Sequence, residues 1–253
     1  MKKLSILVLL IPFITFSYQG FSVEATTNLT KDPNYNTIYN AMTHLKSSVM
    51  IKKNGHEIDV FNQVLDDHPE IFYINYEKTL IWSNGKLEIV YNGSTKTIKA
   101  QIASLNKKIN AIYNRSKAKS TRDKIKDFHD YIIDHAKFDY TNYQKGTIPE
   151  SSYNAYGVLV KGVGVCQGYA DSMKLLLNKA KIPNYFVVGT ANNEPHAWNL
   201  VKVGSRFYHV DTTWDDPITS SGKPIKTYRY FMMNDSQMKK DHRWNPKNYP
   251  RAI

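Results

Sequence analysis

The sequence predicts an α+β fold, and two observations in its second half carry this prediction. Directly after Cys166, the single cysteine of the chain, apolar residues recur at helical spacing until Pro183. Strand-like stretches then follow over 185–188, 196–203 and 206–211. A helix followed by antiparallel strands is typical of α+β proteins rather than of folds in which strands and helices alternate.

The chain begins with a predicted signal peptide over residues 1–25. Lys2 and Lys3 supply a charged start, residues 4–16 an apolar stretch, and Val23-Glu24-Ala25 a cleavage site of the small-residue kind. The apolar stretch is too short to span a bilayer, and no second long apolar run follows it. We therefore expect a secreted, extracellular protein without a transmembrane anchor.

Residues 26–118 are predicted to form an N-terminal α+β region. Helical spacing predicts helices over 35–49, 59–65 and 97–112. Short strands are predicted over 71–74, 79–82 and 86–91. Asn84-Gly85 lies between the last two strands and favours a type I′ hairpin.

A polar, basic break over 114–120 separates this region from a predicted catalytic domain, 119–253. Ser120, with Asp123 three residues later, predicts the start of a helix whose apolar stripe runs to Ala136. The polar residues that follow, 139–153, predict a loop.

Charge and cysteine content limit the possible partners. The 253 residues carry 34 Lys and Arg against 22 Asp and Glu, a formal net charge of +12. Such a charge favours association with anionic surfaces, including cell-wall polymers. The lysines are scattered and no nucleic-acid-binding motif is present, so we expect no specific nucleic-acid partner. A single cysteine also excludes an internal disulfide.

Cys166 lies in a glycine-rich frame, Gly162-Val-Gly-Val-Cys166-Gln-Gly168, at the predicted start of a helix. The positive end of the helix dipole stabilises a thiolate there, and the thiolate is the reactive form of cysteine. Free amide groups in the first helical turn can also hold a developing oxyanion. A small buried apolar role fits an isolated cysteine equally well.

The register of the predicted hairpin places a histidine beside an aspartate. Gly204-Ser205 suits a two-residue type II′ turn, so paired residue numbers should sum to 409. His196 and Asp211 then share one face as diagonal cross-strand neighbours, roughly 7–8 Å apart at the backbone. His209 shares that face and is a weaker substitute base.

Each of these residues has an ordinary structural interpretation when it is taken alone. His196 fits a strand histidine, and Asp211 fits a turn-capping aspartate. Their joint placement beside Cys166 favours a Cys-His-Asp catalytic triad. No metal-ligand spacing, phosphate loop or dinucleotide motif is present, so we expect neither a metal nor another cofactor.

Three separated motifs resemble the core of the transglutaminase-like superfamily, in its exported bacterial branch. They are Gly-Val-Cys166-Gln-Gly-Tyr-Ala, His196-Ala-Trp-Asn and Tyr208-His-Val-Asp211-Thr-Thr-Trp-Asp-Asp. The resemblance covers about residues 120–235. It implies a papain-like fold with Cys166 at the start of the central helix, and an acyl-thioester mechanism on the amides of proteins or peptides.

The resemblance also suggests secondary site residues. The amide of Cys166 and the side chain of Tyr156 are candidates for the oxyanion site. Gln167 is a further candidate for oxyanion or substrate binding, although it follows the cysteine and so is not equivalent to the glutamine that precedes the cysteine in papain-type proteases. Trp198 and Trp214 are candidates to line an acyl tunnel, although core packing fits each of them as well.

Three functions stay open at this point. The acyl group can pass to an amine, as in a transglutaminase, or to water, as in a protease, amidase or deamidase. A binding module that holds wall peptides without turning them over is the third. The sequence does not fix the oligomeric state.

Overall fold

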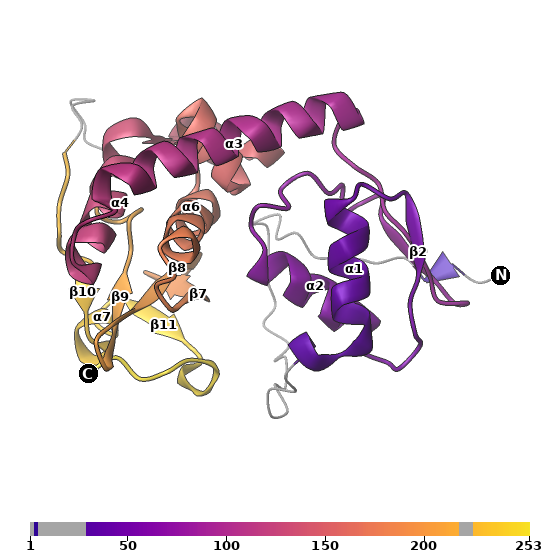
Figure 1. Cartoon of the computed structure of the whole chain (residues 1–253). Coiled ribbons are helices and arrows are strands. Elements are labelled where there is room, and N and C mark those ends of the chain that lie inside the picture. Colours follow the sequence, from indigo (N-terminus) through magenta and orange to yellow (C-terminus); the bar gives the residue numbers. More distant parts are fainter. Residues whose placement is uncertain (1–2, 5–28, 218–224) are drawn as a thin grey trace. The chain divides into compact units, whose positions relative to one another are not determined.

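The computed structural model describes residues 3–4, 29–217 and 225–253, and the chain divides into two compact units, Met1–Ala100 and Gln101–Ile253 (Figure 1). Apart from Lys3 and Leu4, the predicted signal peptide lies outside the described residues. Among the described residues, no helix combines the length and the apolar character needed to cross a bilayer.

The first unit contains two helices and a four-stranded sheet. Helix α1 (Pro33–Thr43) begins after Asp32, whose carboxylate accepts the Asn34 amide, and α2 (Glu57–Asp67) follows. The sheet has the order β1-β3-β4-β2. Its strands are β1 (Lys3–Leu4), β2 (Ser48–Met50), β3 (Leu80–Trp82) and β4 (Lys86–Glu88). The core of the unit is apolar and includes Ile38, Met42, Val60, Phe61 and Leu87.

Three predictions for this unit are wrong in detail. The helix predicted over 35–49 stops at Thr43, because Leu45 takes a left-handed φ of 53° and turns the chain into β2. The strand predicted over 71–74 is reduced to a single bridge from Ile74. The turn is not type I′, which needs positive φ at two residues: only Gly85 has one, and the loop holds three residues.

Helix α3 (Thr95–Ser116) extends the predicted helix over 97–112 at both ends. It crosses the division between the two units at residue 100. The sequence instead predicts the boundary between the N-terminal region and the catalytic domain at residue 118, in the polar break after this helix.

The second unit packs helices α4 (Thr121–His135) and α6 (Cys166–Lys179) with a five-stranded sheet of order β10-β9-β8-β7-β11 (Figure 1). Its strands are β7 (Asn184–Ala191), β8 (Glu194–Val203), β9 (Arg206–Val210), β10 (Phe231–Met233) and β11 (His242–Trp244). The mixed helical and antiparallel layout confirms the predicted α+β class. The predicted cap of α4 is also confirmed, because the Ser120 hydroxyl accepts the Asp123 amide.

The β8–β9 hairpin has the predicted register. Asn199 pairs with Val210 and Val203 with Arg206, so paired numbers sum to 409. Gly204 has a φ of 60°, as the first central position of a type II′ turn requires.

Smaller elements complete this unit. They are β5 (Lys137–Phe138), α5 (Tyr140–Lys145), β6 (Val163–Gly164), α7 (Asp235–Met238) and short turns over Glu150–Tyr153, Gly157–Lys161 and Pro246–Asn248. The loop predicted over 139–153 is therefore partly helical. The Asp139 carboxylate accepts the Asn142 amide group at the start of α5, and Gly146, with a φ of 64°, ends the helix.

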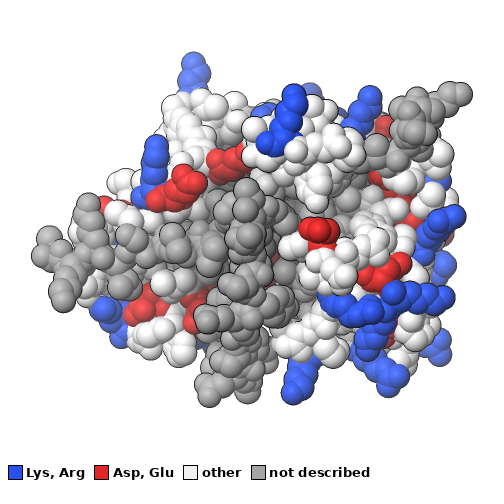
Figure 2. All heavy atoms as spheres, turned by 180° about the vertical axis from the view of Figure 1, so that it is seen from behind, with Lys and Arg blue, Asp and Glu red and all other residues white. Residues whose placement is uncertain are grey.

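Basic side chains are distributed widely over the surface. Figure 2 shows Lys and Arg around the edge of that face and in a group at its right, with Asp and Glu among them. This distribution agrees with the scattered lysines of the sequence.

Candidate active site

Cys166 is the first residue of α6, and the backbone before it is fixed by two neighbouring segments. The Asp139 amide donates to the Gly164 carbonyl at 2.9 Å, and the Val165 amide donates to the Ser152 carbonyl at 2.8 Å. Cys166 is buried, with 9% of the residue's surface exposed.

The glycines beside Cys166 are required by close packing. A Cβ on Gly168 would lie 2.7 Å from the Ser152 carbonyl oxygen, and one on Gly164 would lie 2.3 Å from a methyl group of Val158. Only a residue without a side chain fits at either position. The glycine frame of the motif therefore lets the segment around Ser152 lie directly against the start of α6.

His196 and Asp211 meet at the end of the β8–β9 hairpin. The His196 Nε2 atom lies 2.6 Å from the Asp211 Oδ2 atom. The other carboxylate oxygen, Oδ1, accepts the backbone amides of Thr213 and Trp214 at 3.1 Å each. Asp211 is fully buried, so these bonds satisfy a charge that water does not reach.

Cys166 is the second partner of His196. Its side chain helps to raise the pKa of the imidazole, and because Nε2 faces Asp211, Nδ1 is the nitrogen available for the sulfur. The structure thus brings together the three residues that the sequence singles out, from the start of α6, from β8 and from the end of β9.

Burial and charge oppose one another at this pair. Burial lowers the pKa of His196, but the Asp211 carboxylate and the Cys166 side chain outweigh it and raise the pKa to about 10. Burial would raise the pKa of Asp211, but His196, and then His242, hold it well below its usual range. At neutral pH the pair is therefore an imidazolium beside a carboxylate.

Residues 106–212 match the family model of the transglutaminase-like superfamily. Over these residues the chain is similar to the transglutaminase-like core. Members of this superfamily are typically cysteine-based enzymes. The match includes Cys166, His196 and Asp211.

Solved structures give weaker likenesses. One is a TGase with 15% identity and a TM-score of 0.42, in which the match covers 80% of this chain and 54% of that chain. Another is menin, with 19% identity, a TM-score of 0.34, and coverage of 56% and 30%. The chain thus spans about half the length of the TGase. None of the curated proteins searched matches the chain.

His242 is a member of the candidate site that the sequence does not reveal. Its Nε2 atom lies 3.0 Å from Asp211 Oδ2, the oxygen that also faces His196. Its Nδ1 atom lies 2.6 Å from Asp241 Oδ1, and the Tyr230 hydroxyl donates to Asp241 Oδ2 at 2.7 Å. His242 comes from β11, which pairs with β7, so no short-range spacing connects it to Asp211.

These side chains fit hydrogen bonding better than metal binding. His196, Asp211 and His242 each offer a ligand atom within 4.8 Å of the others. Two ligands of one tetrahedral zinc lie roughly 3.3 Å apart, because each zinc bond to nitrogen or oxygen is about 2.0 Å. The 2.6 Å between His196 and Asp211 is shorter and matches a charge-assisted hydrogen bond.

His209 was suggested as a weaker substitute base because it shares a strand face with Asp211, but both of its ring nitrogens face other partners. Its Nδ1 atom accepts the Trp198 indole at 2.9 Å, and its Nε2 atom lies 3.0 Å from Asp235 Oδ1. Burial lowers the pKa of His209, against the raising effect of Asp235. Neither ring nitrogen is left for Cys166, so the prediction of a substitute base is wrong.

The two tryptophans have different positions. Trp198 is fully buried in a cluster with Val187, Leu200 and Met238, so it is a core residue whose ring also lies against His196. Trp214 is half-buried, with ring centroids 5.9 Å from His196 and 4.6 Å from His242. Of the two, Trp214 is the one that is partly exposed.

The residues considered for the oxyanion site also differ in position. Gln167 is half-buried in the first turn of α6, where the N-cap residue Val165 offers no side-chain cap. Tyr156 begins the turn Gly157–Lys161 and lies under the Lys161 ammonium group. Two other tyrosines, Tyr143 and Tyr153, have their pKa values raised by burial and by the charge of Cys166.

Both of these tyrosines come from the stretch predicted as a polar loop, and no motif distinguishes them. They are therefore residues near Cys166 that only the structure identifies.

The remaining aspartates of the third motif anchor it to the helices. Asp215 lies 3.1 Å from His129 of α4 and accepts the Thr227 hydroxyl at 2.6 Å. Asp216 accepts the Tyr169 hydroxyl of α6 at 2.7 Å. These bonds fix the turn after Asp211 and with it the carboxylate that orients His196.

Proposed function

We propose that this protein is a thiol acyl-transfer enzyme that acts on protein or peptide amides through an acyl-thioester at Cys166. One observation carries the proposal: Cys166 begins a helix and raises the pKa of His196, whose Nε2 atom lies 2.6 Å from the buried carboxylate of Asp211. This division of roles orients the ring and stabilises its charged form.

The first half of the reaction forms the thioester. The Cys166 thiolate attacks the carbonyl carbon of the amide, and the amide groups in the first turn of α6 stabilise the developing oxyanion. His196 gives its proton to the departing nitrogen, so the carbon–nitrogen bond breaks and ammonia or an amine leaves.

The second half releases the acyl group. Neutral His196 takes a proton from an incoming amine or water, which attacks the thioester carbon. The carbon–sulfur bond breaks, and the thiolate and imidazolium are regenerated. We favour an amine as acceptor, because the family match is to the transglutaminase-like core. Transfer to water by the same residues is the alternative.

Amine incorporation tests the proposal. The full chain would be incubated with casein as acyl donor and a fluorescent primary amine, with ammonia release and peptide release followed in parallel. We expect labelled casein and ammonia in equal amounts, and loss of both to background in Cys166→Ala.

The alternatives give different results. Ammonia or peptide release without labelling would assign water as the acceptor. The wild type could instead turn over neither casein nor other amide substrates, while Cys166→Ala binds the substrate as tightly as the wild type. That result would favour a binding module over an enzyme.

A further inference from the structure

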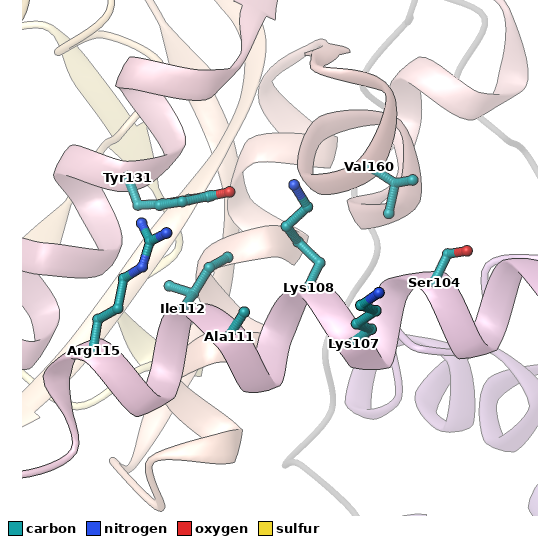
Figure 3. Close-up of a pocket in the computed structure, with 8 residues that line it drawn as sticks. All are labelled: Ser104, Lys107, Lys108, Ala111, Ile112, Arg115, Tyr131 and Val160. Carbon is teal, nitrogen blue, oxygen red and sulfur yellow. The ribbon is translucent and has the colours of Figure 1, made fainter.

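A second site lies in the second unit, between α3, α4 and the turn Gly157–Lys161 (Figure 3). It is a hollow of about 360 Å³. The residues that line it are Ser104, Lys107, Lys108, Ala111, Ile112, Arg115, Tyr131 and Val160. None of them belongs to the candidate active site, so the hollow needs an account of its own.

Three of the lining residues are cations, and none is acidic. Within the described part of the chain, no carboxylate forms an ion pair with Lys107, Lys108 or Arg115. Helix α3 cannot supply one, because its 22 residues include no Asp or Glu. Like charges that line one hollow repel one another, and a bound anion would reduce that repulsion.

Lys108 and Arg115 extend from α3 into the hollow. Lys108 and Arg115 are seven residues apart and therefore lie two turns apart on the same face of the helix. Figure 3 shows Lys108 rising between Tyr131 and Val160, with Arg115 reaching toward the Tyr131 ring. The Arg115 guanidinium lies 5.9 Å from the centroid of that ring, and His135 stacks on Tyr131 at 3.8 Å.

The uncharged residues that line the hollow indicate what kind of molecule carries the anionic group. Ala111, Ile112 and Val160 form an apolar wall, while Ser104 and Tyr131 contribute hydroxyl groups that can bind other hydroxyls. The volume is at the lower end of the range for small-molecule sites and exceeds the need of a bare oxyanion. A sugar or polyol matches this combination of size, apolar face and hydroxyl groups.

We propose that this hollow binds a phosphorylated sugar or polyol. Arg115 has the planar fork that pairs with phosphate, and the two lysines supply point charges. Three cations match a phosphate dianion better than they match a single carboxylate. The phosphate can belong to a free monoester or to an internal diester unit of a polymer, and both share this recognition chemistry.

Calorimetric titration of the full chain tests the site. Glucose 6-phosphate should bind, glucose should not, and glucuronate should bind more weakly than the phosphate because it carries one negative charge. Lys108→Gln should weaken glucose 6-phosphate binding about tenfold, since it removes one charge-assisted bond. Lys99→Gln, on an exposed position of the same helix outside the hollow, should leave the affinity unchanged.

Two results would overturn the proposal. Glucose 6-phosphate could bind no better than glucose, or Lys99→Gln could weaken binding as much as Lys108→Gln, which would mean diffuse attraction to a basic surface.

A glycerol phosphodiester titrated in parallel distinguishes the two sources of the phosphate, a free monoester and a diester unit of a polymer. Preference for glucose 6-phosphate supports a free monoester, and equal affinity supports a polymer unit.

Discussion

Asp211 holds the candidate site together. Its carboxylate faces two backbone amides through Oδ1 and the rings of His196 and His242 through Oδ2. A buried ionised carboxylate is costly unless it is paired and hydrogen-bonded, and four partners meet that requirement here. Because His242 is fixed in turn by Asp241, the position of His196 depends on a residue 46 positions later in the chain.

Replacing His242 tests this dependence. In His242→Phe, Asp211 loses one of the groups that depress its pKa, so its pKa rises toward the usual value. We expect the rate of Cys166 alkylation at pH 6 to fall about tenfold. The acid limb of the profile of alkylation rate against pH should move to higher pH. His242→Gln keeps an N–H donor and should stay within about threefold of the wild type. If the acid limb of this pH profile does not move in His242→Phe, His242 only packs against the site and does not tune Asp211.

The elements around Cys166 illustrate what the sequence can and cannot predict. The helix after the cysteine and the register of the β8–β9 hairpin are confirmed, because an apolar stripe and a two-residue turn at Gly204 specify them locally. The contact of the Ser152 carbonyl with Gly168 joins segments 16 residues apart, and no local pattern encodes it. The sequence shows Gly168 only as part of a glycine-rich frame, and the structure identifies the atom beside it that a side chain would meet.

Gly168→Ala tests this close approach. Alanine is favoured over glycine inside a helix by about 1 kcal/mol, so the substitution would stabilise α6 if space were available. Because the new Cβ would lie 2.7 Å from a backbone oxygen, we expect the free energy of unfolding to fall by about 2 kcal/mol in urea denaturation. Gly146→Ala, where the Cβ meets nothing within 4 Å but φ is 64°, is the control and should cost about 1 kcal/mol. Equal or greater stability of Gly168→Ala would show that the Ser152 segment moves aside freely.

At the scale of the whole molecule, the α+β class and the resemblance to a transglutaminase-like core follow from the sequence. The two edge strands of the five-stranded sheet, β10 and β11, do not. Strands β10 and β11 have three residues each and helix α7 has four, too few for a periodic pattern to appear. These elements nevertheless place His242 against Asp211. The excess of lysine and arginine was predicted as a scattered basic surface, and only folding shows that three of these side chains converge on one hollow.

The most direct test of the account is the rate at which iodoacetamide alkylates Cys166 between pH 4 and pH 10. Intact mass identifies the adduct, because the chain has one cysteine. With its pKa raised to about 10, His196 stays cationic beside the sulfur throughout the neutral range and favours the reactive thiolate. The account predicts fast alkylation already at pH 6, a collapse of that rate in His196→Ala, and no change in His44→Ala. A wild-type rate that rises only near pH ~8.5, the pKa of a free thiol, and does not depend on His196 would contradict it.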